Sequence, residues 1–212
     1  IAVNDPELML GKPAALTAAT GMDALTHAIE TYVTKGAFHW SNALALEAIK
    51  LISQSLEEAV HHGDNIEARS KMAWGQFIAG QAFSNAGLGF VHSMAHQLGG
   101  QYNLPHGVAN AILLPHVEKF NIPACANKLK KVARAMGIGV SDLTDEEGAN
   151  AAIAAIKKLS KAVGIPSGLK ELGVKEEDFR IMAENALADV CTGGNPRDVT
   201  VEDAIAIYKS AM

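Results

Sequence analysis

The chain has 212 residues, of which 49% are hydrophobic, enough apolar material for one good core or two small ones. Its formal net charge of −5 leaves no broad basic surface for a phosphate backbone, so nucleic-acid binding is not expected. No apolar run reaches the length of about 18 residues that a membrane span needs. The two cysteines, Cys125 and Cys191, lie far apart, which is typical of a reducing compartment. We therefore expect a cytoplasmic protein without disulfides.

The first residues do not have the helical pattern of the rest of the chain. The chain begins with Ile-Ala-Val, a pattern typical of the end of a buried strand, and Asp5-Pro6 then gives a turn signal. It has neither an initial Met nor a signal-peptide pattern. We interpret residues 1–16 as a strand remnant and linker from a missing N-terminal domain. Ordinary processing of the N-terminus is the alternative interpretation.

Residues 17–212 have a helical pattern almost throughout, and we predict an all-α domain. No β-alternation, repeat or low-complexity segment is apparent. Gly99-Gly100 is expected to end one helix and Pro115 to kink or end another. Candidate N-caps are Thr17 or Thr20, Asp142, Thr144 and Thr200. The predicted helices cover 17–33, 41–62, 66–85, 90–98, 106–121, 124–136, 145–163, 176–189 and 201–211.

Phosphate-binding motifs are absent from the sequence. No GxGxxG follows a strand and opens a helix, and no GxxxxGK[ST] occurs. The glycines of AGLGF and TGGNP lie in helical or loop context. By its own sequence, the chain has no recognisable cradle for a dinucleotide.

Asp23 and His27 are four residues apart in a helical run with almost no other charge, so both project from the same face. A surface pair explains this spacing, and so does a metal site, because a buried charge needs a partner or a metal. His92 and His96 have the same spacing. Ser93 follows His92, so the HExxH motif of zinc proteases is absent, and two core or surface histidines also explain the pattern.

His106 follows Pro105 where a new helix begins, after a reversal at Gly-Gly and Pro that could return it towards His92. Together with Asp23 and His27, these residues would form a set of three nitrogens and one oxygen, which suits iron(II) or zinc. The remaining histidines are interpreted as structural or without a visible partner: His39, His61, His62 and His116.

Four blocks resemble the C-terminal signatures of the iron-containing (group III) alcohol dehydrogenases: GMDALTHAIE, HSMAHQLGG, LPHGVANAILLPHV and CTGGNPR. The resemblance covers essentially the whole chain. It implies a helical, dehydroquinate synthase-like metal-binding domain whose N-terminal α/β nucleotide-binding domain is absent. It also implies a homodimer, and NAD(H) or NADP(H) bound mainly by the absent domain.

The same resemblance implies the site residues. The family's metal ligands, for Fe(2+) or alternatively Zn(2+), fall on Asp23, His27, His92 and His106. The histidine beside nicotinamide and substrate falls on His96, where it would contact the nicotinamide or relay a proton. Within the family, SNAGLGFVH and DVCTGGNPR are most similar to the lactaldehyde reductase (1,2-propanediol oxidoreductase) type, whose substrate pocket would include Phe83 and Cys191.

The implied activity is the interconversion of a short alcohol or diol with its aldehyde, lactaldehyde and 1,2-propanediol being favoured. General short-chain alcohol and 1,3-propanediol dehydrogenases share these blocks and stay as alternatives. A helical metallohydrolase would need a general base beside the metal, for which only Glu30, a turn beyond His27, is at hand. The third hypothesis, after the dehydrogenase and the metallohydrolase, is a non-enzymatic helical scaffold with incidental histidines.

Overall fold

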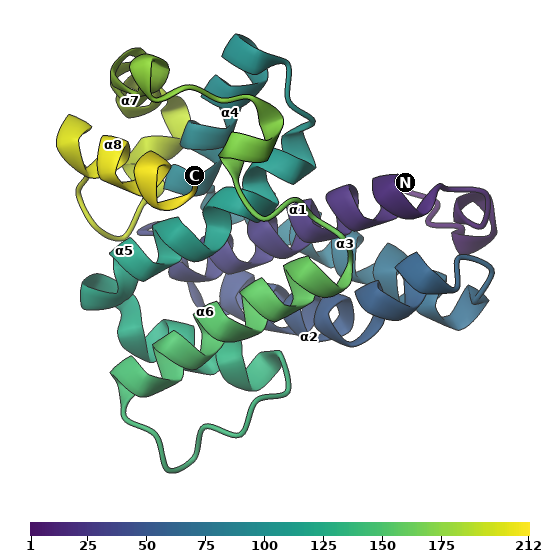
Figure 1. The fold of residues 1–212 in the computed structure, drawn as a ribbon. Helices are drawn as coiled ribbons and strands as arrows, with labels where there is room; N and C mark the ends of the chain where they lie inside the picture. The colour runs from purple at the N-terminus through teal and green to yellow at the C-terminus, as the bar shows by residue number, and fades with distance from the viewer.

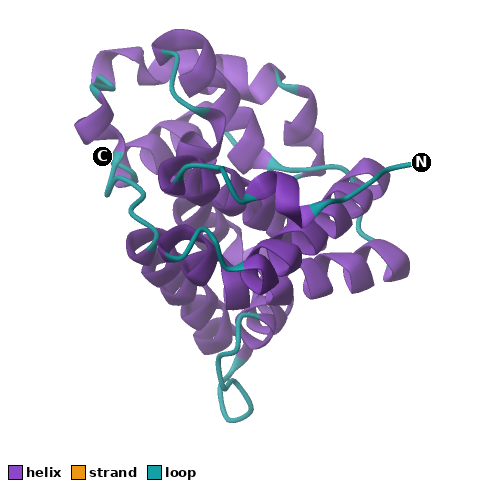
Figure 2. Ribbon diagram, turned by 90° about the vertical axis from the view of Figure 1, so that its right-hand side faces the viewer, coloured by secondary structure: helices purple, strands orange, loops and turns teal.

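A computed structural model describes all residues from 1 to 212 and consists of helices and loops without a strand, which confirms the all-α prediction (Figure 2). The α-helices are α1 (Ala14–Val33), α2 (His39–His61), α3 (Ile66–Ala86), α4 (Phe90–Tyr102), α5 (His106–Ala135), α6 (Asp145–Ala162), α7 (Phe179–Ala188) and α8 (Val201–Ser210). Short 3₁₀ helices are η1 (Pro6–Met9), η2 (Leu169–Leu172), η3 (Glu176–Asp178) and η4 (Val190–Gly194).

Helix α1 is packed against α2, α3 and α5, and the first three helices run side by side towards the end that holds the N-terminus (Figure 1). Helix α5 also packs against α6 and α4, while α4, α7 and α8 gather at the other end of the molecule. None of the helices combines the length and the apolar composition that crossing a membrane requires. Helix α5 therefore connects α1 to α4.

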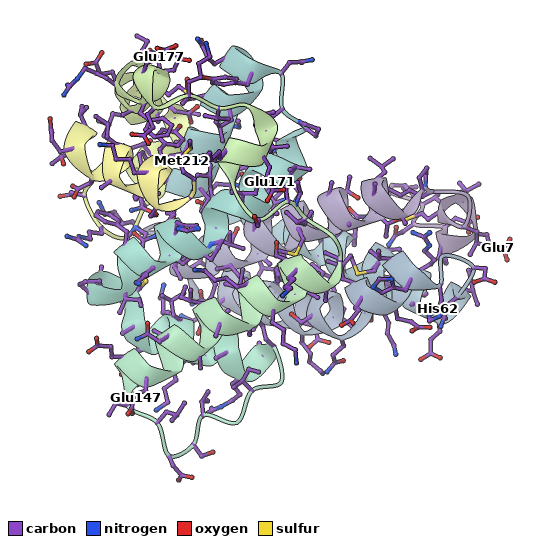
Figure 3. The ribbon with its side chains drawn as sticks, viewed as in Figure 1. Glu7, His62, Glu147, Glu171, Glu177 and Met212 are labelled. Atoms are coloured by element: carbon purple, nitrogen blue, oxygen red, sulfur yellow. The ribbon has the colours of Figure 1, made fainter.

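The apolar side chains form one core rather than two. A single connected cluster of 50 buried residues draws on all eight α-helices, from Met22 in α1 to Tyr208 in α8. Three acidic side chains, Glu7, Glu147 and Glu177, lie exposed at separate ends of the molecule (Figure 3).

The start of the chain differs from the prediction in two respects. Helix α1 begins at Ala14 behind Pro13, so the boundary predicted at residue 17 falls inside a helix. Thr17 and Thr20 are consequently not caps, and Thr20 Oγ1 donates to the carbonyl of Leu16 at 2.8 Å. Residues 1–5 have no regular structure. The origin of this segment in a strand stays a prediction.

Helix α4 does not end at Gly99-Gly100 as predicted but continues to Tyr102. It ends at Asn103, which has a left-handed backbone (φ 52°) and donates its N–H to the carbonyl of Gly99 at 3.0 Å. Asparagine tolerates this conformation better than most residues, and it is a common helix stop. Asn103, rather than the glycines, therefore reverses the chain towards α5.

The two helices predicted at 106–121 and 124–136 are joined into α5, with a kink where Cys125 has non-helical angles two residues after Pro123. Pro115 lies inside the helix and does not end it. Thr144 and Thr200 form capping boxes as predicted, whereas Asp142 is not a cap. The helix predicted at 176–189 is a turn of 3₁₀ helix, η3, followed by α7.

Candidate metal centre

Four side chains converge where α1, α4 and α5 meet: Asp23 and His27 one turn apart on α1, His92 in the first turn of α4, and His106 at the start of α5. One ligand atom from each lies within 4.8 Å of all the others. The Nε2 atoms of His92 and His106 lie 3.8 and 3.5 Å from Asp23 Oδ1. These are the four residues predicted as ligands, and the structure brings all of them together.

This geometry fits a divalent ion. Zinc–nitrogen and zinc–oxygen bonds of about 2.1 Å place tetrahedral ligand atoms about 3.4 Å apart, close to the separations seen here. Three imidazole nitrogens with one carboxylate oxygen suit zinc or iron(II). A cation would also relieve the mutual repulsion of four lone pairs directed at one space. The donor set and its spacing therefore match the metal site predicted from the sequence.

Gly107 lets α5 approach α1 closely enough to complete the site. A Cβ atom on Gly107 would lie 2.2 Å from the carbonyl oxygen of Ala19, one turn before Asp23, and 3.3 Å from Asp23 Cβ. Only glycine permits this contact without a shift of the helices. The position of His106 beside Asp23 thus depends on its neighbour having no side chain.

A buried carboxylate fixes the orientation of His92. Glu30, one turn after His27 on α1, accepts the backbone N–H of Val91 at 2.7 Å with one oxygen and the Nδ1–H of His92 with the other. Its side chain is 1% exposed. Because Nδ1 donates to Glu30, Nε2 keeps its lone pair towards Asp23. Such carboxylate–histidine pairs are common behind metal ligands.

Burial and neighbouring charges shift the pKa values of the three candidate histidine ligands. It lowers the pKa of His27 to about 4, although the Asp23 carboxylate acts in the opposite direction. Burial likewise lowers the pKa of His106. For His92, burial also opposes the charged form, but the charge and hydrogen bond of Glu30 outweigh it and raise the pKa. Two of the three imidazoles are thus neutral near pH 7, the form that binds metals.

Asn110 lies within hydrogen-bond distance of three of the four candidate ligands. Its Nδ2 donates to Asp23 Oδ1 at 2.6 Å and lies 3.2 and 3.0 Å from the Nε2 atoms of His92 and His106. Its own Oδ1 is buried and has no hydrogen-bond partner. An amide with two hydrogens therefore faces three acceptors while its oxygen stays unpaired. Such a local imbalance is expected beside a site built for a cation.

A second buried polar group lies behind Glu30. Burial and the charge of Glu30 raise the pKa of Glu118 on α5 to about 8, so Glu118 is mostly protonated near pH 7. Asn121 and Asn195 bond to each other at 2.8 Å, and Asn195 Oδ1 also accepts from the backbone of Phe90. This network ties the loop after η4 to the beginning of α4.

A cavity of about 360 Å³ opens beside the cluster, between α1 and α3. Asp23, His27 and Phe83 line it, and the Phe83 ring stacks on His27 with centroids 4.7 Å apart. Cys191, the second residue predicted for the substrate pocket, does not line this cavity. It lies half-buried in η4, and burial raises the pKa of its thiol to about 12.

His96 lies beside the ligand cluster but is not one of its four residues. Its ring is parallel to that of His106 with centroids 5.6 Å apart, and its Nδ1 bonds to Asp189 at 2.8 Å. His116 instead bonds to Ser210 at 2.8 Å. The other histidines that belong to no candidate metal cluster are His39, His61 and His62.

Three residues complete the site in roles that were not predicted from the sequence: Glu30, which was considered only as the base of a metallohydrolase, Asn110 and Asp189. For two of them, the spacing in the sequence gives a signal that could have been used. Glu30 follows His27 by three residues and Asn110 follows His106 by four, so each lies on the ligand face of its helix. Asp189 lies 93 residues from His96, and no local pattern links the two.

Residues 17–212 match the family described as "Fe-containing alcohol dehydrogenase family, C-terminal". Over its whole length the chain is 52% identical to 1,3-propanediol dehydrogenase of Klebsiella pneumoniae and 51% identical to NAD-dependent methanol dehydrogenase of Bacillus methanolicus. It is also 51% identical to lactaldehyde reductase of Escherichia coli strain K12. The chain spans 55%, 56% and 55% of these three relatives, respectively.

Solved structures give the same result. A crystal structure of 1,3-propanediol oxidoreductase matches 98% of the chain with a TM-score of 0.97 and 52% identity, and 55% of that protein is covered. An alcohol dehydrogenase from Oenococcus oeni matches 98% of the chain with a TM-score of 0.96 and 48% identity, and 54% of it is covered. The chain therefore belongs to the iron-containing alcohol dehydrogenase family and corresponds to its C-terminal part.

Proposed function

We propose that this chain is the metal-binding half of an NAD(P)-linked enzyme that interconverts a short alcohol or diol with its aldehyde. The observation that supports this most is the convergence of Asp23, His27, His92 and His106 on one space, with Glu30 orienting His92. The relatives named as propanediol, methanol and lactaldehyde enzymes share the chemistry of a small alcohol and its aldehyde.

The residues have distinct roles in this reaction. A divalent ion held by the four ligands, Fe(2+) or alternatively Zn(2+), supplies Lewis-acid polarisation of the substrate oxygen. His106 is half-exposed, and it holds the outer edge of the site. Phe83 gives the adjoining cavity an apolar wall beside His27 that suits a short aliphatic chain. His96 lies next to the ligands without joining them and faces substrate and nicotinamide.

Lactaldehyde and 1,2-propanediol are the favoured substrate pair because SNAGLGFVH and DVCTGGNPR resemble that enzyme type. The chain is 51–52% identical to three enzymes named for different substrates, so overall identity does not distinguish between these substrates. The preference for lactaldehyde therefore depends on these two sequence runs alone. Cys191 contributes to the pocket in this proposal from the side of η4. We further propose that NAD(H) or NADP(H) is held mainly by residues beyond these 212, in a cytoplasmic homodimer.

The geometry argues against a metallohydrolase. Such an enzyme needs a base beside the metal-bound water, and Glu30 is the carboxylate nearest in sequence to His27 that could serve. Both oxygens of Glu30 are engaged by Val91 and His92, and its side chain is 1% exposed. Glu30 therefore supports a ligand and is not free to activate water.

Replacing His106 by alanine tests the proposal, because it removes one of four ligands. We expect the complete enzyme to lose stoichiometric iron and its alcohol-dependent reduction of NAD(P). The measurements are metal analysis and absorbance assays with a panel of short alcohols and aldehydes, with Fe(II), Zn(II) or no metal. His116→Ala is the matched control on the same helix and should keep both properties. Undiminished iron in His106→Ala would contradict the ligand assignment.

A further inference from the structure

Asp189 holds His96 by a hydrogen bond to its Nδ1 atom. The residue lies between α7 and η4, and its Oδ2 accepts from His96 Nδ1 at 2.8 Å. Its other oxygen accepts the backbone N–H of Cys191 at 2.9 Å and lies 3.4 Å from the hydroxyl of Ser93. The Asp189 side chain is only 14% exposed, whereas that of His96 is 40% exposed. Asp189 is therefore fixed by α4 and η4 together.

Asp189 stays ionised in this setting. Burial alone would raise its pKa, but the hydrogen bonds from the backbone of Cys191 and from His96 outweigh burial and hold the pKa below the ordinary value. An ionised carboxylate only accepts hydrogen bonds. His96 must therefore donate from Nδ1, and in the neutral imidazole the lone pair is then on Nε2. The contact selects one of two tautomers.

The His96 ring lies next to two of the candidate metal ligands, so its tautomer affects the space beside them. His96 is parallel to His106 at 5.6 Å and nearly perpendicular to His92, with centroids 6.1 Å apart. The ring thus borders the metal centre while Nδ1 is occupied by Asp189. Nε2 is the ring nitrogen left for a ligand, and a hydroxyl beside the metal centre could donate to its lone pair.

We propose that Asp189 is a positioning residue that locks His96 in the Nδ1–H form, so that Nε2 accepts a hydrogen bond from the substrate hydroxyl. The same carboxylate holds the backbone of Cys191, so the start of η4 and the orientation of His96 are set together. The inference rests on the proposed function for the identity of the hydroxyl, but the tautomer itself is a property of the chain alone.

Nuclear magnetic resonance of the ¹⁵N-labelled, zinc-loaded chain tests the tautomer directly. In the unsubstituted chain, His96 should show a protonated Nδ1 and an unprotonated Nε2. Asp189→Asn keeps the shape but can donate to Nδ1, so His96 should shift towards the Nε2–H form. An Nε2–H tautomer in the unsubstituted chain would overturn the proposal. That measurement needs no variant, so it decides the matter even if Asp189→Asn does not fold.

The complete enzyme then tests the consequence. Asp189→Asn should lower kcat by about 100-fold, since a histidine held in the wrong tautomer loses its role, while zinc content stays unchanged. Asp198→Asn is the matched control, because Asp198 pairs with Lys35 on the surface at 2.8 Å and is 97% exposed. Loss of zinc, or an unchanged kcat despite a shifted tautomer, would refute a positioning role. An inactive unsubstituted enzyme with His96 in the Nδ1–H form would instead refute the proposed function alone.

Discussion

The carboxylate of Glu30 contacts the candidate metal centre through His92. Two donors, the backbone N–H of Val91 and the Nδ1–H of His92, occupy its two oxygens in a site closed to solvent. Val91 lies in the first turn of α4, where a negative charge is also favoured by the helix dipole. One side chain from α1 therefore fixes both the entry of α4 and the tautomer of a ligand.

Glu30→Gln should weaken metal binding without abolishing it. Glutamine has one acceptor and one donor group, so either Val91 or His92 then faces an NH₂ group instead of an oxygen. Loss of such a partner behind a ligand typically lowers metal affinity by about 10- to 100-fold. The measurement is competition for zinc between the chain and a chelator of known affinity.

Glu58→Gln is the matched control for this change. Glu58 also pairs with a histidine, His62 at 3.0 Å, but on the surface and away from the four ligands. The zinc affinity of the Glu58→Gln variant should equal that of the unsubstituted chain. Equal affinities in both variants would show that Glu30 supports the fold and not the metal.

The four ligands were predictable from the sequence only through long matching blocks. The four-residue spacing of His92 and His96 fits two ligands, yet the structure turns one to the metal centre and the other to Asp189. The difference comes from partners far away in sequence, Glu30 and Asp189. Glu30 lies 62 residues from His92 and Asp189 lies 93 residues from His96, so local spacing reveals neither pairing.

At the scale of the helices, the site depends on how closely α5 approaches α1. Gly107 lies against the backbone of Ala19, with no room for a Cβ atom. The two helices present their ligands at this contact, Asp23 on one side and His106 on the other. A change in the spacing between the two helices would therefore change the distance of 3.5 Å between His106 Nε2 and Asp23 Oδ1.

Gly107→Ala should push the two helices apart. The added methyl group would lie 2.2 Å from a backbone oxygen, which cannot move as a side chain end can. Overpacking of this kind typically costs about 1–3 kcal/mol of stability. We expect a lower melting temperature without metal and weaker zinc binding, measured by thermal denaturation with and without zinc.

Gly100→Ala is the matched control within a neighbouring helix. Gly100 lies inside α4, is exposed, and has no atom within 4 Å of the position of a Cβ. Alanine is favoured over glycine in a helix interior by about 1 kcal/mol. This variant should be as stable as the unsubstituted chain or more stable. Equal destabilisation by both substitutions would argue against the close contact at Gly107.

Most helices could be predicted because apolar periodicity is strong, whereas their ends depended on local and tertiary contacts. Gly99-Gly100 favours an end by propensity, yet the buried Leu98 just before it anchors α4 in the core and the helix continues. The stop at Asn103 comes from its left-handed backbone, which the sequence permits but does not require. In α5, likewise, Pro115 is accommodated inside the helix.

At the scale of the whole molecule, one core supports the metal centre. The single cluster of 50 buried residues connects the helices that provide the four ligands. At the same time, the chain spans 55% of the relatives named as propanediol and lactaldehyde enzymes. A single core and all four candidate ligands thus lie within these 212 residues, while the proposed hydride transfer also needs a site for the nicotinamide cofactor.

The isolated chain should therefore fold and bind one divalent ion per molecule but should not oxidise NADH or NADPH with lactaldehyde. Zinc at about 100 times its dissociation constant should raise stability by about 2.7 kcal/mol, because it binds only the folded chain. Circular dichroism should show a helical protein whose melting temperature rises with zinc. His106→Ala should remove this rise. Measurable turnover of the cofactor by the isolated chain would contradict the proposal that its binding site lies mainly in other residues.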